Sequence, residues 1–346
     1  MNTRGTSNNS SEDEYVEMAC TLAGATGRAT REFRPIIGSN SDDPWTTRTH
    51  LLVASPGKLS KEASQKLGLD LPREGYRFIG TQILTLPGFS DVAFSKMITR
   101  GLNEKGLAYT WGMVSPKSEP TYREAFGIPY PQFGTLLLTQ AATVEEAIDL
   151  FDRFPRAVHG NFLLADASGT LALVEISTHT FHVETLTDDG VIGRSNHWIS
   201  ETMAEIGNAF DENASTKIRW RRAEQLLHEG QSKIDVHSLR KVLSDHEGRE
   251  TFGHSICQHG VEGNGELRGG GSVSSEIIEP TRLLFWYAYG WPCGETPHSP
   301  ERQLYQDRSW GVYLPFSLSD LEDGEYVTID GRLTPLAIKM QSAMSR

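Results

Sequence analysis

Cys20 stands where a cysteine could act as a nucleophile with its own base. It follows a polar stretch at residues 1–17 and lies at the beginning of the first apolar run of the chain. If the chain were cut before Cys20, the new α-amine would have a pKa of about 7.7–8.0, close to about 8.5 for the thiol. That amine could take the thiol proton as a general base, without a histidine. The alternative is a small buried cysteine at the start of a strand.

Other groupings of reactive residue types carry weaker signals. His254, Cys257 and His259 have side chains that bind metals, but no CxxC or HExxH pattern accompanies them. The glycine-rich segment 260–271 contains no Gly-Lys-Ser/Thr, and no GxSxG elbow is present in the chain. We therefore expect no metal, no cofactor, no phosphate-binding loop and no serine hydrolase site.

The elements that must position Cys20 form a predicted sheet in the first third of the chain. Apolar runs there are broken by glycine, threonine and charged residues, a pattern that predicts strands. The predicted strands cover 19–25, 34–38, 51–54, 81–86 and 106–111. Cys20 would then lie near the beginning of the first strand.

The rest of the chain mixes helices with further strands. Apolar spacing predicts a helical region over 133–154, with Thr143 as an N-cap and Pro155 ending it. A hairpin over 160–176 follows. The remaining predicted elements are strands at 179–184, 191–195, 272–278 and 282–289 and helices at 216–227 and 236–243. This order predicts a single domain of the α+β class.

Seven short segments, taken together in their order and spacing, carry a family resemblance. They are Cys20-Thr21, GSNSD at 38–42, GLNEKGL at 101–107, GNFLLAD at 160–166, SNH at 195–197, SICQH at 255–259 and WPC at 291–293. The chain resembles N-terminal nucleophile (Ntn) hydrolases of the penicillin acyltransferase-like family. The resemblance covers most of the chain and implies a four-layer αββα sandwich. It also implies an enzyme that makes or breaks linear amide bonds with an N-terminal cysteine.

The resemblance assigns roles residue by residue. Cys20 corresponds to the nucleophile, which the precursor releases by cutting itself between Ala19 and Cys20. Residues 1–19 would then be a leader removed by self-cleavage, and 20–346 the Ntn-hydrolase domain. Asp42 corresponds to the acid of an Asn-x-Asp motif, whose carboxylate would hold the α-ammonium or the thiol proton by a charge-assisted hydrogen bond. The alternative is a turn residue.

Asn196 corresponds to the donor of an oxyanion hole. Its side-chain N–H would bond the tetrahedral oxyanion, an effect of about 2.7–4 kcal/mol in a comparable site, whereas the alternative is an Asn that caps a turn. Arg219 resembles the arginine that the related bile-salt hydrolases and dipeptidases place near the nucleophile; the alternative is a solvated basic helix face. Those relatives usually also have Arg before the Asn of the strand motif, where Ser39 stands here. A backbone N–H within 110–113 is a candidate second oxyanion donor.

Charge and composition limit the partners and the location. The 346 residues include 33 Lys and Arg against 45 Asp and Glu, a formal net charge of −12. We therefore expect no nucleic-acid partner and no attraction to anionic membranes. No apolar run reaches the roughly 18 residues of a membrane span, and 1–17 lacks the apolar core of a secretory signal. We expect a cytoplasmic protein whose three cysteines, Cys20, Cys257 and Cys293, are free thiols.

These features together predict a self-processing cysteine amidohydrolase or acyltransferase that works through a thioester acyl-enzyme. Its partner would be a small-molecule acyl amide or acyl donor. The residues expected to carry the reaction are Cys20, Asp42, Asn196 and Arg219. Two alternatives stay open, a dipeptidase of the related Ntn branch and a binding protein that keeps the Ntn fold but never processes. Retention of the cleaved leader and assembly into a homo-oligomer are also open.

Overall fold

The computed structural model describes residues 19–44, 47–55, 74–83, 98–117, 119–120, 124–259, 261–263, 266–268, 270–295 and 310–344. The predicted leader, apart from Ala19, lies outside these ranges. So do residues 84–86 of one predicted strand and parts of the glycine-rich segment 260–271.

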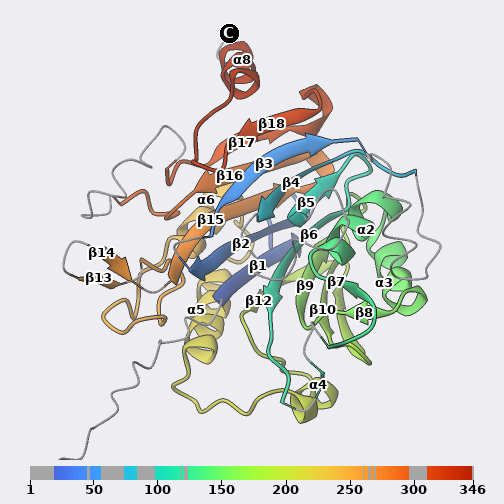
Figure 1. Cartoon of the computed structure of the whole chain (residues 1–346), viewed down its shortest axis with the longest axis vertical. Helices are drawn as coiled ribbons and strands as arrows, with labels where there is room; N and C mark the ends of the chain where they lie inside the picture. Colours follow the sequence, from blue (N-terminus) through green and yellow to red (C-terminus); the bar gives the residue numbers. More distant parts are fainter. Residues whose placement is uncertain are drawn as a thin grey trace, which may run out of the picture.

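Two antiparallel sheets form the centre of the molecule (Figure 1). The six-stranded sheet has the order β12 (Asp189–Arg194), β1 (Ala19–Gly27), β2 (Ile36–Pro44), β15 (Gly270–Glu279), β16 (Leu284–Tyr289) and β17 (Leu314–Ser317). The eight-stranded sheet has the order β11 (Phe181–Leu186), β10 (Leu171–Ile176), β9 (Gly160–Ala165), β6 (Ala108–Met113), β5 (Ile98–Asn103), β4 (Phe78–Ile83), β3 (Thr49–Ala54) and β18 (Gly324–Val327). Short pairs join β7 (Ile128–Pro129) to β8 (Arg156–Ala157) and β13 (Val261–Gly263) to β14 (Glu266–Arg268).

The two sheets pack face to face through an apolar layer. Leu22 of β1 and Ile278 of β15 belong to one buried cluster with Leu102 and Leu163 of the other sheet. Because side chains alternate along a strand, the neighbouring residue of β1 faces the other way. Ala23 accordingly packs in a different cluster, against helices. Each central strand is therefore buried on both faces.

Helices cover the outer face of each sheet (Figure 1). On the eight-stranded sheet lie α2 (Gln132–Gln140) and α3 (Val144–Arg153), and on the six-stranded sheet lie α5 (Ser215–Glu229) and α6 (Val236–Leu243). The described part of the chain also contains α4 (Glu201–Ile206), α8 (Pro335–Met344) and the 3-10 turns η1 (Pro280–Arg282) and η2 (Leu318–Asp320). The helix–sheet–sheet–helix order confirms the predicted α+β, four-layer αββα sandwich. No helix among the described ranges is long and apolar enough to cross a membrane.

The predicted helical region at 133–154 is two helices. Thr143 stands between them as the N-cap of α3, where its side chain accepts a hydrogen bond from the Glu146 backbone N–H. Glu146 in turn accepts from the Ala142 N–H at 2.6 Å. These bonds satisfy donors that the first turn of a helix leaves unpaired, so the chain can restart a helix immediately after α2 ends. Pro155 follows the end of α3, as predicted.

Candidate active site

Cys20 lies in β1, at the centre of the molecule. Its side chain is buried, with 4% exposed, and its backbone N–H donates to Asn196 Oδ1 at 2.9 Å. Strand β6 of the opposite sheet passes beside it, since a Cβ atom built on Gly112 would lie 3.3 Å from the Cys20 Cβ. The thiol therefore sits in the interface between the two sheets, next to the segment 110–113 that we expected to offer a second oxyanion donor.

Arg219 reaches the same point from α5. Its guanidinium is buried and donates through Nη1 to the Cys20 carbonyl at 2.6 Å and to Thr21 Oγ1 at 3.1 Å. Through Nη2 it donates to Asn196 Oδ1 at 2.9 Å. Arg219 is thus not a solvated surface residue. It holds the backbone of Cys20 and the side chain of Asn196 in one network.

Asn196 follows β12 on a tightly held segment. The Asn161 side chain donates to the carbonyls on either side of it, at 2.8 Å to Ser195 and 3.0 Å to His197. The Asn196 backbone N–H donates to Thr216 Oγ1 at 2.8 Å, and its Nδ2 donates to the Met113 carbonyl at 2.8 Å. Asn196 Oδ1 accepts from the Cys20 N–H and from Arg219, while Nδ2 donates to Met113. These three bonds fix the orientation of the carboxamide.

Asp42 lies on β2, directly opposite Ala19 in the register with β1. Its carboxylate accepts from Ser272 Oγ at 2.6 Å and from Gln258 Nε2 at 3.2 Å. Burial raises the pKa of Asp42 to about 7, against the opposing effects of the Arg219 charge and the Ser272 hydrogen bond. The carboxyl is therefore near its midpoint at neutral pH, one strand away from the peptide bond that precedes Cys20.

Arg100, which the sequence reasoning missed, contacts the thiol itself. It extends from β5 of the eight-stranded sheet, and its Nη2 lies 3.3 Å from Cys20 Sγ. Its Nε donates to Ser39 Oγ at 2.9 Å and lies 3.3 Å from a carboxylate oxygen of Glu276. Ser39 is the position at which the sequence lacks the arginine usual in the related hydrolases. Arg100 places a cation beside the thiol from the opposite sheet, and the Ser39 hydroxyl accepts a hydrogen bond from it. The available signal was a charged residue within an otherwise uncharged strand, directly before the GLNEKGL segment.

The surroundings of Cys20 favour the protonated thiol. Burial raises the pKa of Cys20 to about 11. The Arg100 charge lowers it, while the carboxyl groups of Asp43 and Asp42 raise it further. A thiol with such a pKa is a poor nucleophile at neutral pH, because the thiolate is the attacking species. Fast attack by Cys20 on a substrate at neutral pH would therefore need a base beside the thiol.

Comparison with known proteins gives the family. Residues 71–262, more than half of the chain, match the family described as acyl-coenzyme A:6-aminopenicillanic acid acyl-transferase. The chain belongs to this family. Arg100, Asn196 and Arg219 lie inside the matched segment of this acyl-transferase family member, and Cys20 and Asp42 precede it. Family membership confirms the resemblance, and with it the predicted enzyme class of acyltransferases and amide hydrolases.

Solved structures with a similar fold are hydrolases and acylases by name. A mutant of conjugated bile acid hydrolase from Clostridium perfringens aligns with a TM-score of 0.53 at 13% identity, covering 90% of this chain and 97% of that one. Penicillin V acylase from Agrobacterium tumefaciens aligns with a TM-score of 0.47 at 16% identity, covering 78% and 83%. At this identity the first likeness establishes the fold. No curated protein matches the sequence.

Two asparagines in the segments that carry the family resemblance, Asn40 and Asn103, bind backbone carbonyls of neighbouring helices and loops. Asn40 of β2 donates to the carbonyls of Leu243 and Ile256, at 2.8 and 2.9 Å, and so ties α6 and the following segment to the sheet. Asn103 of β5 donates to the carbonyls of Leu138 and Ala141, at 2.8 and 2.7 Å, at the end of α2. The side chains of both asparagines fasten helices to sheets.

The residues with metal-binding side chains regroup in the fold. Cys257 and His259 lie beside His246 and Cys293, with their ligand atoms all within 4.8 Å of one another. His254, which the sequence grouped with Cys257 and His259, is not part of this cluster. The sequence spacing did not link Cys293 to this group. Cys293 follows β16 and comes close to Cys257 only in the folded chain.

Proposed function

We propose that the chain is a self-processing cysteine amidohydrolase or acyltransferase acting on a linear amide of the N-acyl amine or N-acyl amino acid type. The observation that carries the proposal is the setting of Cys20. Its backbone nitrogen is held by Asn196 at 2.9 Å while its sulfur lies 3.3 Å from Arg100. One residue thus has both its nitrogen and its sulfur bound by polar groups, as an N-terminal nucleophile requires.

The first step is cleavage between Ala19 and Cys20. The Cys20 sulfur attacks the Ala19 carbonyl carbon, the C–N bond breaks, and the Cys20 nitrogen takes up the thiol proton. Water then hydrolyses the thioester, which frees the leader 1–19 with a carboxylate and restores the thiol. Arg219 donates a hydrogen bond to the Cys20 carbonyl at 2.6 Å. This bond supports the step because it holds Cys20 in place while the Ala19–Cys20 peptide bond is replaced by a thioester.

The α-amine released by cleavage becomes the base that the buried thiol needs. Its ordinary pKa of about 7.7–8.0 suits proton transfer at neutral pH. The Asn196 oxygen already accepts from this nitrogen and would orient the amine, and Asp42 would stabilise its ammonium form by charge. Arg100 would stabilise the thiolate.

Turnover then follows the same path with a substrate amide. The thiolate attacks the acyl carbon, and the amine leaves with the proton that the α-amine donates. A carboxamide carries two N–H bonds, so the bond from Asn196 to Met113 leaves one for the oxyanion. The thioester acyl-enzyme passes its acyl group to water or to an amine. The mature domain is 20–346, and cytoplasmic location stays a prediction from the sequence.

The intact mass under denaturing conditions, compared between wild-type protein and Cys20→Ala, tests the proposal. We expect the wild type to give a fragment that begins at Cys20 and the variant to stay full length. If both stay whole, the proposed mechanism fails because the α-amine is never released. A panel of N-acyl amides, with release of the amine as the readout, then tests turnover by the processed protein.

A further inference from the structure

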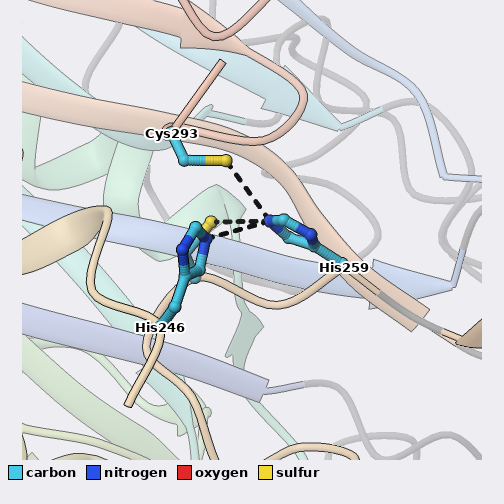
Figure 2. A group of neighbouring side chains, drawn as sticks. His246, His259 and Cys293 are labelled. Carbon is cyan, nitrogen blue, oxygen red and sulfur yellow. Dashed lines mark hydrogen bonds between the residues drawn. The ribbon is translucent and has the colours of Figure 1, made fainter. Parts of the chain in front are cut away.

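We propose that His246, Cys257, His259 and Cys293 form a structural Zn²⁺ site. The ligand atoms of these four side chains all lie within 4.8 Å of one another. Figure 2 shows His246, His259 and Cys293 pointing toward one centre. The site is separate from Cys20 and does not depend on the proposed function. It replaces the sequence-based expectation that the chain binds no metal.

The three distances from His259 to the other ligand atoms are close to the edges of a zinc tetrahedron. Bonds of about 2.0–2.1 Å to nitrogen and 2.3 Å to sulfur place tetrahedral ligands about 3.3–3.8 Å apart. His259 Nε2 lies 3.1 Å from His246 Nε2, 3.5 Å from Cys257 Sγ and 3.3 Å from Cys293 Sγ. These three separations are close to tetrahedral edges, and all four ligand atoms lie within 4.8 Å of one another.

A shared cation accounts for this convergence more simply than hydrogen bonds between neutral groups do. A neutral imidazole nitrogen either donates one proton or accepts one. His259 Nε2 nevertheless faces three partners, a second imidazole nitrogen and two sulfurs, at 3.1–3.5 Å. Four electron-rich atoms aimed at one point are stabilised by a cation. Two thiolates balance the charge of Zn²⁺, and the mixture of sulfur and imidazole ligands favours zinc over magnesium or calcium.

A carboxylate, a backbone N–H and an aromatic ring surround the four proposed ligands. Glu295 faces the outer nitrogens of both rings, with its oxygens 3.8 Å from His246 Nδ1 and 3.7 Å from His259 Nδ1. Its backbone N–H lies 3.3 Å from Cys293 Sγ. The Trp291 ring stacks on His259, with centroids 3.9 Å apart and planes 1° apart. At these distances the Glu295 carboxylate attracts both rings by charge without a direct hydrogen bond, and the stack holds His259 in place.

Four protein ligands close the tetrahedron, which makes the site structural. It would join the segment after α6, the segment before β15 and the turn after β16. Gln258 lies between two of the ligands, and its side chain donates to Asp42 at 3.2 Å. The metal would therefore also hold Gln258 against Asp42.

Metal analysis of the purified full-length protein tests the proposal. We expect about one zinc per chain in the wild type and loss of the metal in His259→Ala and Cys293→Ala. His254→Ala is the matched control, because it removes a nearby histidine outside the cluster, and it should keep its zinc. After chelation, added Co²⁺ should give the visible bands of a tetrahedral site and thiolate charge-transfer absorption in the near ultraviolet.

The wild-type measurements decide the matter even if a variant fails to fold. X-ray absorption at the zinc edge should report two sulfur and two nitrogen ligands. Wild-type protein that contains no zinc after growth with added zinc, and that gives no cobalt bands, overturns the proposal. A disulfide between Cys257 and Cys293 in freshly purified protein, detected as the loss of two hydrogens in the mass, overturns it as well.

Discussion

Arg100 joins the two sheets at Cys20. It is almost fully buried, and it lies beside both the Cys20 sulfur and the Glu276 carboxylate, which is itself fully buried. A buried cation in such a position stabilises the thiolate and also neutralises the acid behind it. One side chain therefore links the reactivity of Cys20 to the stability of the sheet interface.

Removal of the Arg100 charge should leave Glu276 buried without its partner. We expect Arg100→Met to lower the free energy of unfolding by about 3–5 kcal/mol, as for other broken buried pairs. The double variant Arg100→Met/Glu276→Gln should recover most of this loss, because no buried charge remains unpaired. Urea unfolding of the single and double variants makes the comparison. Equal stability of the two would show that the charges do not interact as described.

Asp42 makes the stability of the protein depend on pH. Burial raises its pKa from 3.8 to about 7 in the folded chain. Because the folded state binds the proton more tightly, this contribution to stability is complete below pH 3.8 and is lost as the pH rises through 7. In Asp42→Asn, the free energy of unfolding should fall less between about pH 4 and about pH 7 than in the wild type.

Urea unfolding at both pH values measures this difference. The exposed residue Asp320 provides a control, since Asp320→Asn should keep the wild-type pH dependence. Asp42→Asn should keep part of the decrease in the free energy of unfolding with pH, because burial also raises the pKa of Asp43, to about 6. An Asp42→Asn variant with the full wild-type slope contradicts the shifted pKa of Asp42.

Among the elements, β9 positions the segment that carries Asn196. Asn161 donates to the Ser195 and His197 carbonyls, so Asn161→Ala should leave two buried acceptors unpaired and lower the free energy of unfolding by about 1–3 kcal/mol for each. It should also slow turnover, since Asn196 loses its fixed place. Turnover per folded molecule, corrected by urea unfolding, is the measurement.

Asn103 is a matched control for Asn161. It sits in the same sheet and also bonds two carbonyls, those of Leu138 and Ala141, but these belong to the end of α2. Asn103→Ala should lose at least as much stability while its folded fraction keeps wild-type turnover. If both variants slow turnover equally, the slower turnover comes from a general loss of packing in the sheet and not from a change in the position of Asn196.

The elements themselves were largely predictable from the sequence, and the contacts between them were not. Period-two apolar runs and the Thr143 cap depend on neighbours in the chain, so β1, β9, β10 and α3 follow from local patterns. Arg100 reaches Cys20 only because β5 faces β1 across the interface, and Cys293 meets Cys257 only because β16 pairs with β15. Such proximity comes from the sheet order, which local spacing does not encode.

At the scale of the whole molecule, the site depends on how closely the sheets approach. Cys20 belongs to one sheet and Arg100 to the other, and Gly112 of β6 in the second sheet lies close to Cys20. A methyl group there would lie 3.3 Å from the Cys20 Cβ, which is tighter than ordinary contact. The absence of a side chain at Gly112 therefore allows the two sheets their observed approach beside Cys20.

Gly112→Ala should push the sheets apart by a few tenths of an ångström and move Arg100 away from Cys20. Since a misplacement of about 1 Å can slow a reaction about 10²-fold, we expect processing to slow by roughly tenfold, with the fold retained. The time course of intact mass after synthesis measures the rate. Gly230→Ala is the control, because a Cβ there meets its nearest neighbour at 3.4 Å and lies at the end of α5. Unchanged processing in Gly112→Ala would mean that the sheet separation at this point does not govern the reaction.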